Sequence, residues 1–207
     1  LAASSGGVAD EWHTDMTFLE SPPLMSILHI VKCPEVGGDT MWTNLSKAFA
    51  ALSKPMQDLC NDLSALHDAA PHFRPDQLTL HPVVRKHPDG NGDVLYVNEH
   101  FTRRIVEMSI EESDMLLKFL TNWVKKSDFT VRHKWQEGTL ALWDNRCTQH
   151  FVLNDFTGER IIQRVTVMGD VIKPVKKLSY KPWTHNGRFT ASSRYDFPLY
   201  EYLSKKK

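Results

Sequence analysis

The sequence predicts a mainly β fold with helical insertions (α+β), of the β-sandwich or jelly-roll type. Strand-like patterns occupy the first and last parts of the chain, and helix-like patterns lie between them. Strands at both ends with helices in the middle are typical of a β-sandwich that carries helical insertions. The chain shows no internal repeat and no second apolar core, so we expect a single domain over residues 1–207.

Apolar runs and apolar–polar alternation define the expected strands. Residues 24–31 are a near-continuous apolar run of strand length. Residues 129–135 and 139–143 alternate apolar and polar side chains, and residues 161–168 are rich in β-branched residues, which favour strands. A further strand is expected to begin at Thr40.

Two helices are expected between these strands. Ser53 and Pro55 stand where an N-cap and a first helical turn belong, and apolar residues follow at helical spacing as far as Leu66. Ser109 and Glu112 have the spacing of a capping box and predict the start of the second helix.

The segment between the two expected helices is rich in proline. Residues 67–93 contain Pro71, Pro75, Pro82 and Pro88, and we expect an irregular insertion there. The Asp-Gly-Asn-Gly sequence at residues 89–92 is a strong turn signal, which predicts a hairpin between its apolar flanks.

The charge balance argues against some classes of partner. Lys+Arg and Asp+Glu both number 25, so no general positive field favours nucleic acid or a membrane surface. No apolar run has the length of a membrane span, and no signal peptide is visible. An odd number of cysteines predicts reduced thiols and a cytoplasmic protein: Cys33, Cys60 and Cys147. Because the chain begins at Leu1 with small residues, we expect that an N-terminal segment is missing.

A candidate metal site begins with His13 and Asp15. In a strand, residues two apart point to the same face, so the imidazole and the carboxylate would converge while Thr14 faces away. Two histidines and one carboxylate form the facial triad of non-haem Fe(II) oxygenases. His150, which follows a strand in the last third of the chain, is the best candidate for the third ligand.

Two arginines downstream of His150 are candidates for anion binding. Arg160 and Arg164 are four residues apart, so in a strand they share a face. Buried arginines need anionic partners, because an unpaired buried charge is costly. One anion could be the distal carboxylate of a keto acid bound to the metal, to which Thr40 could also donate a hydrogen bond, and the other could belong to the substrate.

Several motifs in the same order resemble the Fe(II)- and 2-oxoglutarate-dependent dioxygenases of the taurine dioxygenase (TauD/TfdA) family. The resemblance covers residues 12 to 170. Its motifs are Trp-His-Thr-Asp-Met-Thr-Phe at 12–18, Gly-Gly-Asp-Thr at 37–40, His-Pro-Val-Val-Arg-Lys-His-Pro at 81–88, Val-Asn-Glu-His-Phe-Thr-Arg-Arg-Ile at 97–105 and Trp-Asp-Asn-Arg-Cys-Thr-Gln-His at 143–150.

The resemblance implies a double-stranded β-helix, or jelly roll, and a set of roles. It implies Fe(II) as the metal and 2-oxoglutarate with O₂ as cosubstrates. The implied iron ligands are His13, Asp15 and His150, the implied 2-oxoglutarate partners are Thr40 and Arg160, and the implied substrate contacts are Arg164, Phe101 and Met16. The loop before Arg160 is one residue shorter than in the taurine enzyme, which leaves open which arginine holds 2-oxoglutarate.

The implied activity is hydroxylation of a small anionic substrate, with succinate and CO₂ as coproducts. Ala9 stands where the taurine enzyme has a polar substrate contact, so another sulfonate or an alkyl sulfate fits as well as taurine. The product would break into an aldehyde and sulfite or sulfate. An aryloxyalkanoate dioxygenase and a non-catalytic metal-binding jelly roll are the alternatives, and a homo-oligomer is left open.

Overall fold

The structure is a computed structural model that describes residues 10–178 and 183–186. The small residues at the start of the chain and the substrate position at Ala9 lie outside the described residues.

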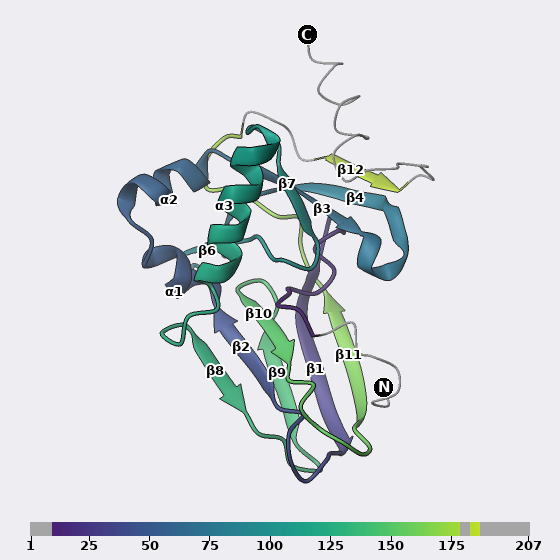
Figure 1. The fold of residues 1–207 in the computed structure, drawn as a ribbon. Coiled ribbons are helices and arrows are strands. Elements are labelled where there is room, and N and C mark those ends of the chain that lie inside the picture. The colour runs from purple at the N-terminus through teal and green to yellow at the C-terminus, as the bar shows by residue number, and fades with distance from the viewer. Residues whose placement is uncertain (1–9, 179–182, 187–207) are drawn as a thin grey trace.

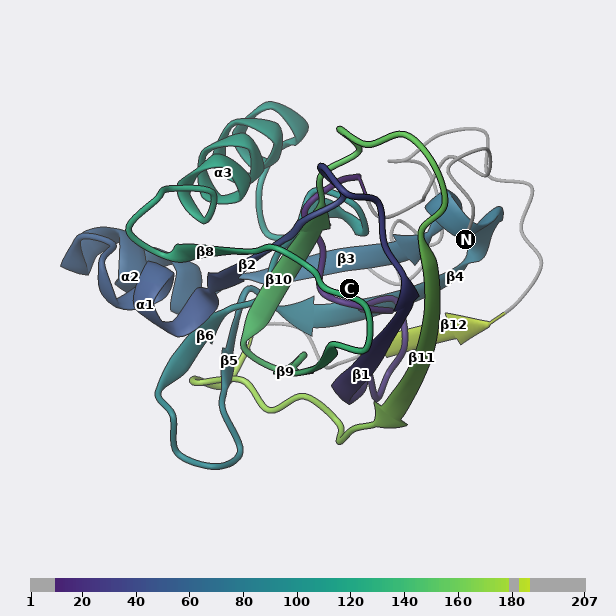
Figure 2. The ribbon, with the colours of Figure 1, turned by 90° about the horizontal axis from the view of Figure 1, so that it is seen from below.

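Two antiparallel three-stranded sheets form the lower part of the molecule as drawn in Figure 1. The first has the order β11-β1-β9 and consists of β1 (Pro23–Lys32), β9 (Leu140–Asp144) and β11 (Ile161–Met168). The second has the order β10-β2-β8 and consists of β2 (Thr40–Asn44), β8 (Thr130–His133) and β10 (Thr148–Val152). Figure 2 shows β1 and β11 on one side and β2 and β10 on the other.

Large side chains fill the space between these two sheets. Leu28 and Ile30 of β1 are buried with Trp143 of β9, and Trp42 of β2 packs against them. The rings of Trp42 and Trp143 have centroids 5.5 Å apart. The two sheets therefore pack face to face. The continuous apolar run of β1 is only half buried, because Met25, Ile27 and Val31 lie on the outward face of the strand.

A third sheet, of four strands, occupies much of the segment for which we expected an irregular insertion. Its order is β12-β4-β3-β7, with β3 (Ser64–Ala69), β4 (Arg74–Pro82), β7 (Thr102–Ile105) and β12 (Trp183–Asn186). The expectation for residues 67–93 was wrong in this part. Pro71 lies in the short helix η2 (Ala70–His72), and Pro82 is the last residue of β4. Pro75 lies near the start of β4, where the pairing with β3 shifts register between Asp68 and Ala69. The predicted hairpin is confirmed as β5 (Val84–Lys86) and β6 (Asp93–Leu95).

Three helices lie beside the sheets: α1 (Leu45–Ala50), α2 (Lys54–Asn61) and α3 (Ile110–Trp123). The predicted capping box is confirmed, because the Glu112 amide donates to Ser109 Oγ at 3.2 Å and the Ser109 amide donates to Glu112 Oε2 at 2.9 Å. The first predicted helix is shorter than expected, since Leu66 belongs to β3. No helix among the described residues is long and apolar enough to span a membrane.

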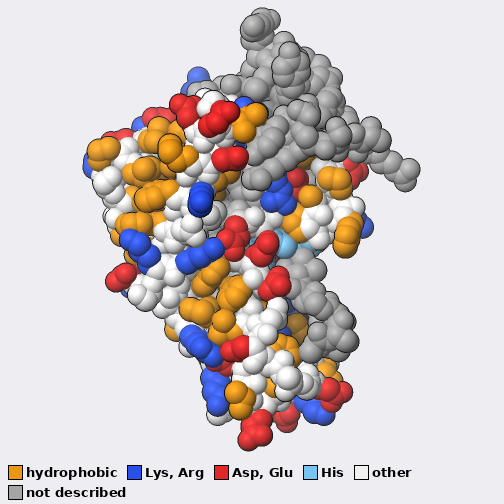
Figure 3. All heavy atoms as spheres, in the orientation of Figure 1, with side chains coloured by type: hydrophobic (Ala, Val, Ile, Leu, Met, Phe, Trp, Pro, Cys, Tyr) orange, Lys and Arg blue, Asp and Glu red, His pale blue; other side chains and the backbone are white. Residues whose placement is uncertain are grey.

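The largest apolar cluster lies beneath the helices. It joins residues of α1 and α3 to the β5–β6 hairpin, and Leu120 of α3 is fully buried within it. The other side of α3 faces solvent, where Met115 and Phe119 are exposed. Figure 3 shows apolar side chains mixed with charged ones on the side where the helices lie.

This division of α3 predicts a large difference between two similar truncations. We expect Leu120→Ala to lower the free energy of unfolding by about 3 kcal/mol, because it leaves a cavity in a packed core. Met115→Ala on the exposed side of the same helix should change it by no more than about 0.5 kcal/mol. Urea unfolding of both variants measures this, and equal losses would contradict the packing of α3.

Candidate metal centre

The backbone brings the two predicted histidine ligands directly opposite each other. The His13 amide donates to the His150 carbonyl at 3.1 Å, and the His150 amide donates to the His13 carbonyl at 2.8 Å. This is the closely hydrogen-bonded pair of an antiparallel ladder. The motif does not form the longer strand that we expected, because the chain turns directly after this bridge at residues 15–18.

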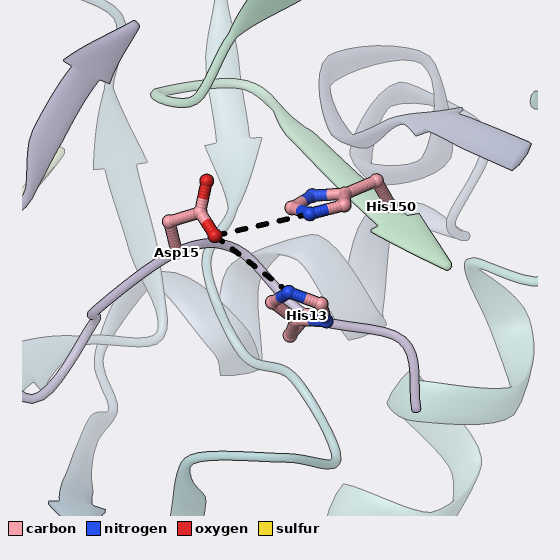
Figure 4. Close-up of side chains that lie close together, drawn as sticks. All are labelled: His13, Asp15 and His150. Atoms are coloured by element: carbon pink, nitrogen blue, oxygen red, sulfur yellow. Dashed lines mark ion pairs between the residues drawn. The ribbon is translucent and has the colours of Figure 1, made fainter. Parts of the chain in front are cut away.

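The bridge and the turn bring His13, Asp15 and His150 together (Figure 4). Asp15 Oδ1 lies 3.6 Å from His13 Nε2 and 3.8 Å from His150 Nε2. All three side chains are buried. Two ligands that each lie about 2.1 Å from one ion can be at most about 4.2 Å apart, so these separations fit a shared metal ion.

The histidine tautomers also fit a metal ligand. His13 Nδ1 lies 2.7 Å from the Glu11 carbonyl, which can only accept, so Nδ1 carries the proton and Nε2 keeps its lone pair. His150 Nδ1 is buried and has no hydrogen-bond partner among the described residues. Burial and the neighbouring His13 lower the pKa of His150, which favours its neutral, ligating form.

Asp15 has one oxygen engaged and one free for a metal. Its Oδ2 accepts hydrogen bonds from Arg164 Nη2 and, at 2.9 Å, from Ser26 Oγ. Burial opposes ionisation, but electrostatic interaction with His150, the hydrogen bond with His13 and the positive charge of Arg164 outweigh it and hold the pKa of Asp15 well below its usual range. The carboxylate is therefore ionised and presents Oδ1 to the two imidazoles.

Asn145 is a positioning residue that the sequence analysis missed. Its side chain is fully buried, and its Oδ1 accepts from the Asp15 amide at 3.0 Å while its Nδ2 donates to the Asp15 carbonyl at 3.2 Å. These two hydrogen bonds to the Asp15 backbone fix the turn that orients the Asp15 carboxylate. The available signal was its place in the Trp-Asp-Asn-Arg motif.

The four-stranded sheet holds the segment that follows Asp15. His67 Nδ1 lies 2.9 Å from Thr17 Oγ1, and His81 Nε2 donates to the Leu19 carbonyl at 2.9 Å. Thr79 Oγ1 donates to the Phe18 carbonyl at 2.6 Å. The segment for which we expected an irregular insertion is thus a platform for the metal motif.

The burial of His81 predicts that the metal-free protein loses stability in acid. Burial lowers the pKa of His81 from 6.5 to about 4. Between pH 6.5 and pH 4 the unfolded chain therefore binds a proton at His81 that the folded chain does not bind. The contribution of His81 to the free energy of unfolding is complete above pH 6.5 and is lost as the pH falls towards 4. Between pH 7 and pH 5 we expect this histidine to remove about 2 kcal/mol.

Urea unfolding at the two pH values in the presence of a chelator measures this loss. His81→Gln should reduce the pH dependence by that amount, because glutamine does not titrate and its amide can still donate to Leu19. An unchanged pH dependence in this variant would contradict the assignment.

A second group with metal-type ligands lies elsewhere and is less suited to a cation. It consists of His87, Asp144 and Cys147. Its carboxylate already accepts from Arg146 at 2.9 Å and 2.7 Å and lies 3.1 Å from His87 Nε2. Burial raises the pKa of the Cys147 thiol to about 11, which disfavours the thiolate. These contacts describe a structural network between the β5–β6 hairpin and the β9–β10 turn.

The two predicted anion-binding arginines lie in different surroundings. Arg164 pairs with Asp15 and donates to Ser26 Oγ at 2.9 Å. Arg160 is 8% exposed, its Nε donates to the Gly38 carbonyl at 3.2 Å, and its guanidinium lies 6.0 Å from the Trp135 ring centre. Among the described residues Arg160 forms no ion pair, and its Nη2 is buried without a hydrogen-bond partner. Burial lowers the pKa of Arg160, the expected effect on an uncompensated charge.

Thr40 contacts the same tryptophan. Trp135 Nε1 donates to Thr40 Oγ1 at 2.9 Å, so the threonine hydroxyl keeps its own hydrogen for another acceptor. Gly37 and Gly38 both have positive φ, of 79° and 71°, and a side chain at Gly37 would meet Asp155 at 2.5 Å. This glycine turn places the Gly38 carbonyl within hydrogen-bond distance of Arg160 Nε. It also places the Thr40 hydroxyl within hydrogen-bond distance of Trp135 Nε1.

The two predicted pocket residues lie beside the metal centre. Phe101 is buried, and its ring centre lies 6.3 Å from that of His13. Met16 has a positive φ of 49° and packs against the cluster of Phe18 and Phe101. His72, which the sequence analysis missed, is exposed on η2 and places its ring 5.4 Å from Phe101.

A buried set of two imidazoles and one carboxylate is the ligand set of the facial-triad class of non-haem metal proteins. Comparison with known proteins agrees. The family model described as "Taurine catabolism dioxygenase TauD, TfdA family" matches residues 2–166, and the chain belongs to this family.

Individual relatives are similar over most of the chain. It is 38% identical to the alpha-ketoglutarate-dependent sulfate ester dioxygenase of Pseudomonas putida, with 83% of this chain and 64% of that protein covered. It is 35% identical to the alkylsulfatase of Acinetobacter baylyi, with 83% and 60% covered. A solved taurine dioxygenase from Burkholderia xenovorans has a TM-score of 0.78 at 37% identity, with 88% and 64% covered. The chain thus spans less than two thirds of the length of these relatives.

Proposed function

We propose that the protein is an Fe(II)- and 2-oxoglutarate-dependent dioxygenase that hydroxylates a small anionic organic substrate, a sulfonate or an alkyl sulfate. The family membership supports the reaction type, and relatives named for sulfate esters support the substrate class. The two face-to-face sheets would be the halves of the family's double-stranded β-helix. The cytoplasmic location and a homo-oligomer stay predictions.

The observation that carries this proposal is the buried guanidinium of Arg160. A metal-binding protein without a keto-acid cosubstrate would have no use for a buried charge that lacks an anion. A carboxylate bound there would accept from Arg160 Nη2 and from the Thr40 hydroxyl, since both residues lie against Trp135. This arrangement favours Arg160 over Arg164 as the partner of 2-oxoglutarate.

The buried triad would hold the metal through His13 Nε2, Asp15 Oδ1 and His150 Nε2. When bound, Fe(II) with 2-oxoglutarate supplies the activation of O₂ that the side chains cannot supply. The chain itself fixes the His13 tautomer through Glu11, aims Asp15 through Asn145 and keeps water from the ligands by burial.

Arg164 would bind the acidic group of the substrate. It uses Nη2 for Asp15 and Ser26, and among the described residues its Nε and Nη1 have no hydrogen-bond acceptor. A sulfonate or sulfate at these two nitrogens would lie next to the metal ligand Asp15. The carbon that bears the acidic group would then be the one nearest to the metal, which agrees with release of sulfite or sulfate.

The test is succinate formation by the full-length protein with Fe(II), 2-oxoglutarate and O₂. The panel contains taurine, longer alkanesulfonates, alkyl sulfates and phenoxyacetates, and sulfite and sulfate release are measured in parallel. Substrate-dependent succinate with sulfite or with sulfate supports the proposal and separates a sulfonate dioxygenase from an alkylsulfatase.

Two other outcomes would replace the proposal. Succinate with phenoxyacetates alone would assign a carboxylate substrate and the aryloxyalkanoate alternative. Metal binding without 2-oxoglutarate binding, and without succinate above the uncoupled background, would leave the non-catalytic metal-binding protein.

A further inference from the structure

His100 is a further imidazole beside the metal centre. It lies in the motif at 97–105, and the proposed reaction gives it no role. It is 5% exposed, and its ring centre lies 5.4 Å from that of His13 and 4.5 Å from that of Phe101. Arg103 Nη2 donates to the His100 carbonyl at 2.8 Å, which fixes the backbone at this position. His100 does not belong to the group of possible metal ligands around Asp15, so it lies outside the ligand shell.

Glu11 decides which nitrogen of His100 carries the proton. His100 Nδ1 lies 2.7 Å from Glu11 Oε2. A carboxylate oxygen accepts, so Nδ1 donates to it, and in the neutral ring Nε2 is left as a hydrogen-bond acceptor. The backbone carbonyl of Glu11 accepts from His13 Nδ1, so Glu11 sets the tautomers of two adjacent imidazoles, His13 and His100.

The acceptor at His100 Nε2 has no donor among the described residues. The atom is buried and unpartnered, and its surroundings include the rings of Phe101 and His72. A buried polar atom without a hydrogen-bond partner is destabilising, and a ligand that donates to it removes this cost. His72, whose ring lies 6.2 Å away, is exposed on the short turn η2, so this wall of the site faces solvent.

We propose that His100 is a specificity-determining residue of the substrate site. Its Nε2 accepts a hydrogen bond from a hydroxyl or ammonium group that the substrate carries at the end away from its acidic group. This inference rests on the proposed function, because it assumes that Arg164 binds the acidic group. His100 packs on His13 and Arg164 pairs with Asp15 Oδ2, so the two residues flank the triad at different ligands. A substrate held by both would be polar at both ends.

The test compares substrates that differ only at the far end. Full-length protein is given butane-1-sulfonate, 3-hydroxypropane-1-sulfonate and 3-aminopropane-1-sulfonate, and kcat/KM is measured from succinate formation. Calorimetric affinities for the protein loaded with Fe(II) and 2-oxoglutarate without oxygen provide a readout that is independent of turnover. We expect a preference of about tenfold for a donor-bearing sulfonate over butane-1-sulfonate. The hydroxyl and amino arms show which donor is used.

Two substitutions separate the acceptor from the general packing of the ring. His100→Asn keeps an N–H near Nδ1 for Glu11 but has no atom at the Nε2 position, so the preference should fall to about one. His100→Gln places an amide oxygen near the Nε2 position and should restore part of the preference. His29→Asn, on the outward side of β1, is the matched control and should keep the wild-type ratio.

Equal kcat/KM and affinity for all three sulfonates in the wild-type protein, or an unchanged ratio in His100→Asn, overturns the inference and leaves the proposed function standing. Absence of succinate with every sulfonate and sulfate overturns both.

Discussion

Replacing His150 by alanine is expected to abolish stoichiometric Fe(II) binding, with a rise in Kd of more than about 100-fold. The variant removes one of three ligands from a closely spaced, buried set, whereas changes to groups that merely orient ligands already cost 10–100-fold. Isothermal titration of the metal-free protein with Fe(II) under anaerobic conditions measures the Kd, and circular dichroism checks that the variant is folded.

The second group of metal-type ligands supplies the control for this experiment. Cys147→Ser should leave Fe(II) affinity unchanged, because the carboxylate in that group is already paired with Arg146. Loss of Fe(II) binding in Cys147→Ser with full binding in His150→Ala would move the metal to His87 and Asp144 and would remove the basis of the proposed reaction.

Arg160→Leu is expected to weaken 2-oxoglutarate binding by about 100-fold or more and to leave Fe(II) affinity unchanged. Removing one partner of a buried, hydrogen-bonded charge pair costs about 2–5 kcal/mol of binding energy. The same substitution should not destabilise the ligand-free protein and should raise its free energy of unfolding, because it replaces a buried charge that has no anionic partner by an apolar side chain. Calorimetric titration with 2-oxoglutarate and urea unfolding of the metal-free protein measure the two effects.

The opposite signs of these two effects make the prediction specific. A structural arginine would lose stability on substitution and would not affect the cosubstrate. Lys32→Met is the matched control, since it removes a nearby cation that is half exposed and paired with Glu159. It should change neither quantity by more than about 0.5 kcal/mol. Unchanged 2-oxoglutarate affinity in Arg160→Leu would contradict the role of Arg160.

Local patterns predicted the elements that depend on neighbouring residues. The capping box of Ser109 and Glu112 and the hairpin around residues 89–92 were both confirmed, because each is stabilised by contacts within a few residues. The prolines at residues 71 to 82 predict irregular structure by their local preference, and this prediction is wrong. Proline is compatible with turns and strand ends, and that is where these residues lie.

Orientation within the site could not be predicted from local patterns. Motif spacing identified His13, Asp15 and His150, and the structure brings them together, but the groups that orient them came from elsewhere in the chain. Asn145 holds the Asp15 backbone across a sequence separation of 130 residues. Asp144, its neighbour in the same motif, lies instead against His87 and Arg146.

The sequence by itself determined the chemistry available to this protein. It contains two imidazoles and a carboxylate with the spacing of a metal motif, two arginines suited to anions and a balanced charge that argues against nucleic acid. Only the tertiary structure decided how these groups are used. It pairs Arg164 with Asp15. It leaves Arg160 buried beside Trp135 with no anionic partner among the described residues. It also holds His100 next to His13 through a hydrogen bond to Glu11. The reason is that burial and partner choice depend on which distant segments pack together, and the free energy of a charge is set by those surroundings.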